Sequence, residues 1–253
     1  MFVAYLHNEG YSPASIVSYT SSLGYIHRLL GYTDPTSSKL VQKLIAGATR
    51  VTPPAPPRLP ITIIILHRLL EAVDLHIKHY YHRPLLKAMF VTSFFGLMRM
   101  GEVTMSKHGE VPLQMNQLQL SQSKFIISIS QFKHNSKLKP VDIIFPRSQD
   151  VSMCPVVLMS SYLLLRGFQP GPIFAYPSLS PIKRSFFYSK LNFLLQSIGC
   201  DVDRYQSHSF RIGGASYFAE LGYTDSQIRL LGRWDSNAFI RYIRDIRAHN
   251  QSS

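Results

Sequence analysis

Residues 207–244 read SHSFRIGGASYFAELGYTDSQIRLLGRWDSNAFIRYIR, and this stretch decides the fold of the chain. Its pattern of caps and apolar positions predicts three short helices. Ser207 is a suitable N-cap for the first helix, and Thr224 or Asp225 can cap the second. Gly213 and Gly214 carry no side chain, so they predict that another segment packs closely against the first helix.

Four side chains in this stretch suit the recognition of a phosphodiester. His208 and Arg211 are three residues apart, so they share one face at the N-terminal end of the first helix. Unpaired backbone N–H groups at that end favour an anion. Trp234 adds an indole donor and Tyr242 adds a hydroxyl group. The stretch therefore predicts a site for a nucleic-acid backbone.

Three motifs here resemble the C-terminal motif of the tyrosine recombinases, the phage-integrase-like family. They are HSFR at 208–211, LGRW at 231–234 and Tyr242. The sequences HSFRIGGAS, LGRW and RYIR are most similar to the motifs of recombinases from eukaryotic mobile elements of the Crypton and DIRS kinds. The resemblance implies a chain that is mainly α-helical with a small antiparallel β-sheet, in which a short helical core-binding-like domain precedes the catalytic domain.

The composition indicates a globular protein with a polyanionic partner. The chain has 253 residues, of which 45% are hydrophobic, and a formal net charge of +13. Such a charge favours nucleic acid or an acidic membrane surface. No apolar run approaches the roughly 18 residues that span a bilayer, so no membrane span is predicted. Cys154 and Cys200 have no CxxC partner, which argues against a disulfide framework and a zinc finger.

Residues 1–50 predict a small helical unit. Ser12-Pro13 supplies an N-cap and a first-turn proline. The apolar positions that follow at helical spacing are Ile16, Tyr19, Leu23, Ile26 and Leu30. Residues 51–60, VTPPAPPRLP, hold five prolines and predict a semi-rigid linker between two domains.

The resemblance implies a role for each of these regions. Residues 1–50 correspond to a core-binding-like (SAM-like) DNA-binding domain that is shorter than in the family, so we expect it to be truncated. Residues 61–253 correspond to the catalytic domain. Lys39, Lys43 and Arg50 are expected to contact DNA phosphates from the first domain.

A second informative stretch is FFGLMRMGE at 94–102. An apolar helix is predicted to end near Gly96, with Arg99 at a helix junction and Glu102 three residues later. Such an Arg–Glu pair is usually a structural ion pair. The stretch also resembles the family's first box, in which an arginine contacts the scissile phosphate. The resemblance then implies that Glu102 supports the site.

Residues 115–147 change to the alternation that is typical of β-strands. The segments 125–130 and 141–145 predict a hairpin or a three-stranded sheet with a basic connection. In the family a lysine on such a hairpin reaches the active site, and Lys133 matches that place best. Lys137 and Lys139 compete for this role and are otherwise expected to contact DNA. A basic hairpin tip without a catalytic role is the alternative.

His76, His79 and His82 recur every three residues between two predicted helices. This spacing drifts around a helix, and neither a carboxylate nor a cysteine completes a metal site, so we predict no metal. A basic patch that faces solvent or phosphate is the interpretation that we favour.

The resemblance implies that DNA is cut and rejoined through a covalent 3′-phosphotyrosine intermediate, without metal, ATP or another cofactor. Tyr242 is the implied nucleophile. Arg99 and Arg211 hold the non-bridging phosphate oxygens, His208 assists proton removal, and Lys133 protonates the leaving oxygen. The implied catalytic residues are Arg99, Lys133, His208, Arg211, Trp234 and Tyr242.

The implied partner is double-stranded DNA, on which the protein is expected to self-associate as a dimer or tetramer. Arg233 is also expected to contact this DNA. A eukaryotic mobile-element origin implies a nuclear location. Two alternatives stay open: a catalytically silent DNA-binding protein derived from such a recombinase, and a type IB topoisomerase-like enzyme. Metal-dependent nucleases are disfavoured, because the chain has only 14 acidic residues and they form no obvious cluster.

Overall fold

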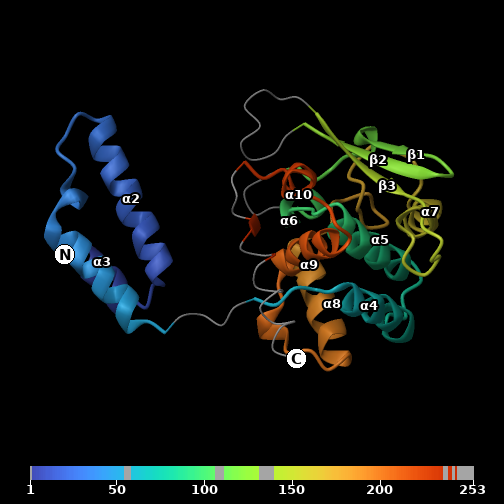
Figure 1. Cartoon of the computed structure of the whole chain (residues 1–253), viewed down its shortest axis with the longest axis horizontal. Helices are drawn as coiled ribbons and strands as arrows, with labels where there is room; N and C mark the ends of the chain where they lie inside the picture. Colours follow the sequence, from blue (N-terminus) through green and yellow to red (C-terminus); the bar gives the residue numbers. More distant parts are fainter. Residues whose placement is uncertain are drawn as a thin grey trace. The chain divides into compact units, whose positions relative to one another are not determined.

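The chain forms two compact units, Met1–Pro56 and Pro57–Ser253, which we call the N-terminal and C-terminal units (Figure 1). The structure is a computed structural model that describes residues 2–53, 58–105, 111–130, 140–235, 239–240 and 243. The division falls within the predicted proline-rich linker, although the helix before it extends to Val51. The fold is mainly α-helical with a small antiparallel sheet, as the sequence predicted.

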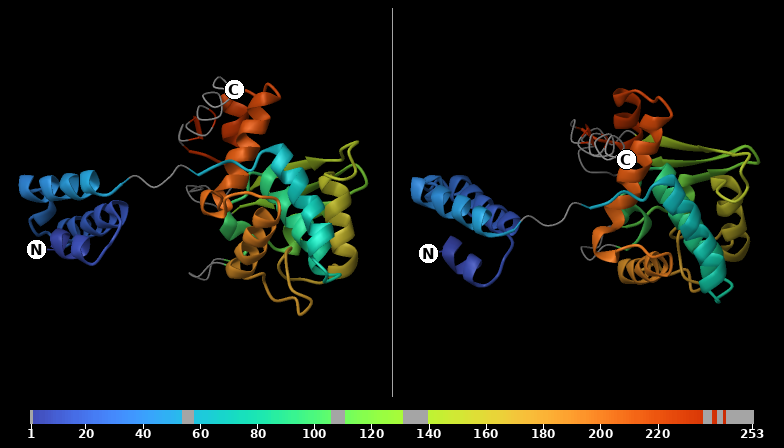
Figure 2. Two further views of the ribbon diagram at one scale, coloured as in Figure 1. Left: turned by 90° about the horizontal axis from the view of Figure 1, so that it is seen from below. Right: turned by 60° about the horizontal axis from the view of Figure 1, so that its bottom comes forward.

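The N-terminal unit is helical (Figure 2). Its elements are α1 (Phe2–Asn8), α2 (Pro13–Leu29), the 3-10 turn η1 (Pro35–Ser37) and α3 (Lys39–Val51). The start of α2 is as predicted, because the Ser12 hydroxyl accepts the N–H of Ser15 at 3.2 Å and Pro13 is the first helical residue. Proline is favoured there since its missing N–H would have no helical partner.

The buried side of α2 is narrower than its pattern of apolar residues. Its buried residues are Ile16, Thr20 and Gly24, which lie four residues apart along one stripe. Tyr19 and Ile26, which belong to the same apolar pattern, are each 49% exposed. Residues that lie four apart on a helix form a narrow ridge, so the core of this unit is correspondingly small. The core consists of Val3, Leu6, Ile16 and Ala48.

In the C-terminal unit several helices pack around one buried helix. Its helices are α4 (Ile63–His76), α5 (His82–Phe95), α6 (Met100–Val103), α7 (Pro155–Arg166), α8 (Arg184–Ser197), α9 (Ser207–Glu220) and α10 (Asp225–Gly232). The unit also has two 3-10 turns: η2 (Met115–Gln117), which precedes the sheet, and η3 (Val202–Arg204), which lies between α8 and α9. Helix α5 contacts α4, α6, α7 and α9, and every residue from Ala88 to Phe94 is buried. A helix that is apolar all round belongs in a core, and α5 takes that place.

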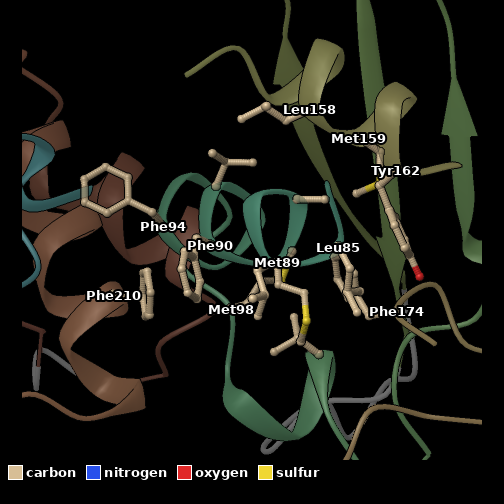
Figure 3. Close-up of a cluster of buried hydrophobic side chains, with 14 of the residues drawn as sticks. Leu85, Met89, Phe90, Phe94, Met98, Leu158, Met159, Tyr162, Phe174 and Phe210 are labelled. Atoms are coloured by element: carbon tan, nitrogen blue, oxygen red, sulfur yellow. The ribbon is translucent and has the colours of Figure 1, made fainter. Parts of the chain in front are cut away.

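Aromatic rings join α5 to its neighbours (Figure 3). Phe90 stacks on Phe210 of α9 with ring centroids 5.4 Å apart. Phe90 also meets Phe187 of α8 edge-to-face at 5.7 Å. Since Phe210 belongs to the HSFR motif, this packing fixes the motif against the core.

The sheet lies at the edge of the C-terminal unit (Figure 1). Strands β1 (Leu118–Leu120), β2 (Lys124–Ile129) and β3 (Val141–Pro146) pair antiparallel in the order β1-β2-β3. Phe125 pairs with Phe145 across β2 and β3, and their rings stack at 4.2 Å. The predicted alternation is therefore correct, with one face of the sheet buried.

Two glycines let α9 approach its neighbours at backbone distance, as predicted. A Cβ atom on Gly213 would overlap the carbonyl oxygen of Ile61, and one on Gly214 would overlap that of Phe94. Helix α9 is thus held between the segment before α4 and the end of α5. Only glycine permits this contact.

The caps of α9 and α10 differ in how well the sequence predicted them. Helix α9 begins at Ser207, but its N-cap is Gln206, whose N–H donates to the Ser209 hydroxyl at 3.0 Å. The prediction that Ser207 is the cap is wrong by one residue, because the buried Ser209 hydroxyl anchors the preceding turn. Thr224 caps α10 as predicted, in a reciprocal capping box with Gln227.

We expect Gly213→Ala to destabilise the C-terminal unit by at least about 1–3 kcal/mol, because the new methyl group meets backbone that cannot move aside. Denaturant unfolding of the full chain measures this. Gly47→Ala is the matched control, since Gly47 lies in α3 with open space around it. That change is expected to stabilise the N-terminal unit by up to about 1 kcal/mol. Equal stability of Gly213→Ala and the unsubstituted protein would contradict the close packing.

Candidate active site

The candidate active site is built on two turns that each follow a helix. One turn, at 96–99, joins α5 to α6, and the other, at 232–234, follows α10. Leu97 and Arg233 adopt left-handed backbone conformations, with φ of 46° and 54°. A left-handed non-glycine residue costs roughly 1–2 kcal/mol, so other contacts must hold both turns.

Arg211 joins the two turns from α9. Its terminal nitrogens donate to the carbonyl oxygens of Leu97 and Gly232. The residue is only 2% exposed. The Trp234 ring covers the guanidinium at 4.1 Å from its central carbon, an arrangement that stabilises the cation. A Cβ on Gly232 would overlap this indole, so the glycine of LGRW leaves room for the tryptophan.

Arg233 joins the same turns from the other side. Its side chain has no exposed area and lies 2.8 Å from the Glu102 carboxylate. It also donates to the carbonyls of Gly96 and Leu97, each at 3.3 Å. The prediction that Arg233 contacts DNA therefore conflicts with the structure, because a guanidinium enclosed in this way cannot reach a duplex.

Glu102 orders the first turn, where the sequence placed it as a supporting residue. Its carboxylate accepts the N–H of Arg99 at 2.7 Å and lies 3.5 Å from the Arg99 guanidinium. Arg99 in turn donates to the carbonyl of Arg233 at 3.0 Å. The Arg99 side chain is 27% exposed, so it is the accessible guanidinium of the three at these turns.

Positive charge is in excess around the two turns. Among the described residues there, three guanidinium groups meet one carboxylate, that of Glu102. The N-terminal end of α9, with Arg211 in its first turns, adds its unpaired N–H groups. An anion is the ligand that this arrangement favours.

His208 is the second residue of α9 and lies at the surface. Partial burial lowers the pKa of its imidazole, and the charges of Arg211, Arg58 and Arg99 lower it further. The ring is therefore neutral at pH 7 and able to accept a proton.

Arg58 is a residue of this neighbourhood that the sequence reasoning missed. It lies at the end of the proline-rich segment, within the C-terminal unit, where two backbone hydrogen bonds hold residues 59–61 to the segment 204–209. The Leu59 N–H donates to the Arg204 carbonyl at 2.8 Å, and the Ile61 N–H donates to the Ser209 carbonyl at 2.9 Å. The signal in the sequence is an arginine among prolines next to an apolar segment, a pattern that by itself predicts only a linker.

Several predicted site residues lie outside the described residues. These are Lys133, Lys137, Lys139 and Tyr242. Three residues near Tyr242 in the sequence are described: Phe239, Ile240 and Ile243. Phe239 and Ile243 are buried in a cluster with Leu97 of the first turn, and Ile240 packs against that cluster. Phe239 also packs on the Trp234 ring at 5.5 Å. The described part of this segment thus lies beside the two turns.

The predicted DNA contacts of the N-terminal unit lie on α3. Lys39, Lys43 and Arg50 are exposed and share one side of this helix, at spacings of four and seven residues. In the described part of the chain no cluster of His, Cys, Asp and Glu could hold a metal ion. Within that part, too, no helix has the length and apolar character needed to cross a membrane.

The fold is similar to that of solved DNA recombinases. XerH site-specific recombinase bound to palindromic difH substrate has a TM-score of 0.63 and 15% identity, over 88% of this chain and 59% of that chain. The Tn1549 transposon integrase in complex with circular intermediate DNA has a TM-score of 0.62 and 10% identity, over 95% and 78%. XerA recombinase has a TM-score of 0.55 and 17% identity, over 98% and 96%.

At these identities the similarity establishes the fold. In two XerH complexes the chain spans 53% and 59% of the length of the recombinase. No family model matches the sequence, and no curated protein matches it.

We expect the pKa of His208 to lie below about 6.5, the ordinary value for histidine, and to rise in Arg58→Gln, because a nearby positive charge is removed. NMR titration of the ring protons, assigned with His208→Gln, measures this. Below about pH 6.5 the unfolded chain binds more protons at this residue, so its contribution to stability falls there with falling pH. Arg147→Gln is the control, because Arg147 lies at the far end of β3. An equal pKa of His208 in Arg58→Gln and Arg147→Gln would contradict the proximity of Arg58 to His208.

We expect Arg233→Leu to lower the free energy of unfolding by about 3 kcal/mol, because Glu102 loses its closest cation while it is only 10% exposed. Arg229→Leu is the matched control, since Arg229 is exposed on α10. Adding Glu102→Leu to Arg233→Leu is expected to recover part of the loss, since no unpaired carboxylate remains. Thermal and denaturant unfolding measure these changes, and indistinguishable stabilities of Arg233→Leu and Arg229→Leu would refute the role of the pair.

Proposed function

We propose that this chain is a DNA recombinase of the tyrosine recombinase family, which cuts and rejoins DNA without metal or ATP. One observation carries the proposal: Arg99, Arg211 and Trp234, from three separate segments, meet at two turns with excess positive charge. The chain does this within the fold of recombinases whose solved structures contain DNA.

In this proposal the scissile phosphate binds beside the two turns. Arg99 contacts its oxygens directly, because its guanidinium is the accessible one. Arg211 donates to two backbone carbonyls and is 2% exposed, so its remaining N–H donors reach the phosphate only if the cover over its guanidinium shifts. The Trp234 indole can only donate a hydrogen bond, which also suits a phosphate oxygen.

The chemistry requires two proton transfers and one covalent bond to the protein. The Tyr242 hydroxyl oxygen attacks phosphorus, and its proton passes to the neutral imidazole of His208. The bond from phosphorus to the 5′ oxygen breaks, and Lys133 protonates that oxygen. A 3′-phosphotyrosine remains. The reverse steps join a 5′ hydroxyl to the same phosphate, so no nucleotide cofactor is needed.

DNA binding would extend beyond the active site. The exposed face of α3 with Lys39, Lys43 and Arg50 would contact phosphates from a core-binding-like domain, and Lys137 and Lys139 would add contacts from the β-hairpin. Self-association on double-stranded DNA belongs to the same proposal. A Crypton- or DIRS-type origin and a nuclear location also belong to this proposal, and they rest on the sequences of the motifs alone.

A catalytically silent DNA-binding protein is the second candidate. The observation that favours it is the enclosure of Arg211, which is 2% exposed and bonded to backbone carbonyls. A site in this state binds an anion through its charge without holding the phosphate in a reactive position.

The test is a covalent-adduct assay on nicked DNA, in which release of a short fragment traps the reaction. Since the target sequence is unknown, a pool of random duplexes serves as substrate. We expect an adduct on denaturing gels that Tyr242→Phe abolishes and Tyr223→Phe, an exposed tyrosine of the same unit, retains. Arg99→Ala is expected to reduce adduct formation by about a hundredfold or more while the protein stays folded.

The outcomes separate the candidates. An adduct that survives Tyr242→Phe would exclude Tyr242 as nucleophile. Binding to the pool with no adduct on any member would favour the silent DNA-binding protein. Relaxation of supercoiled plasmid by a monomer, without joining of separate duplexes, would indicate a topoisomerase-like activity.

A further inference from the structure

A second group of basic side chains surrounds a cavity at the other end of α5. The cavity has a volume of about 230 Å³, several times that of a water molecule. Its lining includes Lys78, Lys190, His76, His79, His82 and Phe193. These residues come from the end of α4, the loop that follows it, the start of α5, and α8.

The histidine rings are ordered by their neighbours. His79 and His82 stack with ring centroids 4.0 Å apart. His82 also meets Phe186 of α8 at 5.0 Å, and His76 meets Phe193 at 6.0 Å, both edge-to-face. The rings are therefore held in a defined arrangement around the cavity.

Among the residues that line the cavity, none is acidic. The acidic residues nearby on α4 are paired elsewhere, Asp74 with Lys87 and Glu71 with His67. Arg83, at the start of α5, donates to the carbonyl of Ile77. Burial lowers the pKa of His82, and the charges of His79 and Lys190 lower it further. The lining thus carries positive charge that no described carboxylate offsets.

A metal ion does not fit this group. The three histidines are not arranged to bind one ion, since no described cluster has metal-binding geometry. Two of the rings stack face to face, so their nitrogen atoms do not converge on a common point. Two lysine ammonium groups beside the cavity would also repel a cation.

We propose that this cavity binds a phosphate group, with Lys78 and Lys190 supplying charge and the imidazole rings supplying N–H donors. The ligand is either a free phosphate or a phosphodiester of a nucleic-acid backbone. The site is separate from the two turns, because α5 with its 14 residues lies between His82 and Gly96. At 1.5 Å per residue this is a distance of about 20 Å.

The test is an NMR titration of the full chain with sodium sulfate, which stays a dianion from about pH 6 to about pH 8, the range where histidine titrates. We expect saturable shifts of the His79 and His82 ring protons, with tighter binding at the lower pH. Bound anion favours the protonated imidazole and raises the lowered pKa of His82, which is the reason for this direction.

Paired variants identify the site. The double variant Lys78→Gln, Lys190→Gln is expected to weaken sulfate binding by about tenfold or more. Lys124→Gln, an exposed lysine of β2, removes the same kind of charge elsewhere and is expected to bind like the unsubstituted protein. Shifts that do not saturate, or equal affinity in the double variant, would overturn the proposal.

Two further titrations distinguish the sources of phosphate. If a short DNA duplex shifts the same ring protons and the double variant loses the effect, the ligand is a phosphodiester. If inorganic phosphate shifts them and the duplex does not, the ligand is a free phosphate. If neither shifts them, the proposal fails. None of these results depends on Tyr242, so the covalent-adduct assay stands apart from them.

Discussion

The structure depends on the hydrogen bonds between two guanidinium groups and the backbone carbonyl oxygens at the end of α10 and in the turn that follows α5. The last carbonyls of a helix have no partner within it and carry partial negative charge. At the end of α10 the carbonyls of Leu231 and Gly232 accept bonds from Arg233 and Arg211. In the turn after α5 the carbonyls of Gly96 and Leu97 accept bonds from the same two arginines, which brings two distant parts of the chain together. Both turns contain a left-handed residue, so the guanidinium groups also hold a backbone that is unfavourable by itself.

The three arginines at the two turns differ in their surroundings. Arg233 is enclosed and paired with Glu102, Arg211 is enclosed beneath an indole, and Arg99 is partly exposed. Arg233 and Arg211 hold the two turns together, and Arg99 can contact a ligand without rearrangement. This contact between the turns also requires that α9 lie at backbone distance from α5, which is possible because Gly214 has no side chain.

The end of the linker is part of the same neighbourhood. The backbone at 59–61 is bonded to the segment around the start of α9, and Arg58 adds charge close enough to affect His208. The cavity at the other end of α5 is basic as well, so cationic surface is present at both ends of the central helix.

The sequence by itself determined what depends on near neighbours in the chain: the Ser12-Pro13 and Thr224 caps, the alternation of the sheet, and the shared face of His208 and Arg211. Caps and periodicity act over a few residues, so the pattern of types is sufficient. The tertiary structure alone decided which arginines are enclosed, that the segment after Arg58 lies beside the start of α9, and how narrow the buried stripe of α2 is. Arg99 and Arg233 are the same residue type, and only contacts between segments more than a hundred residues apart distinguish their surroundings.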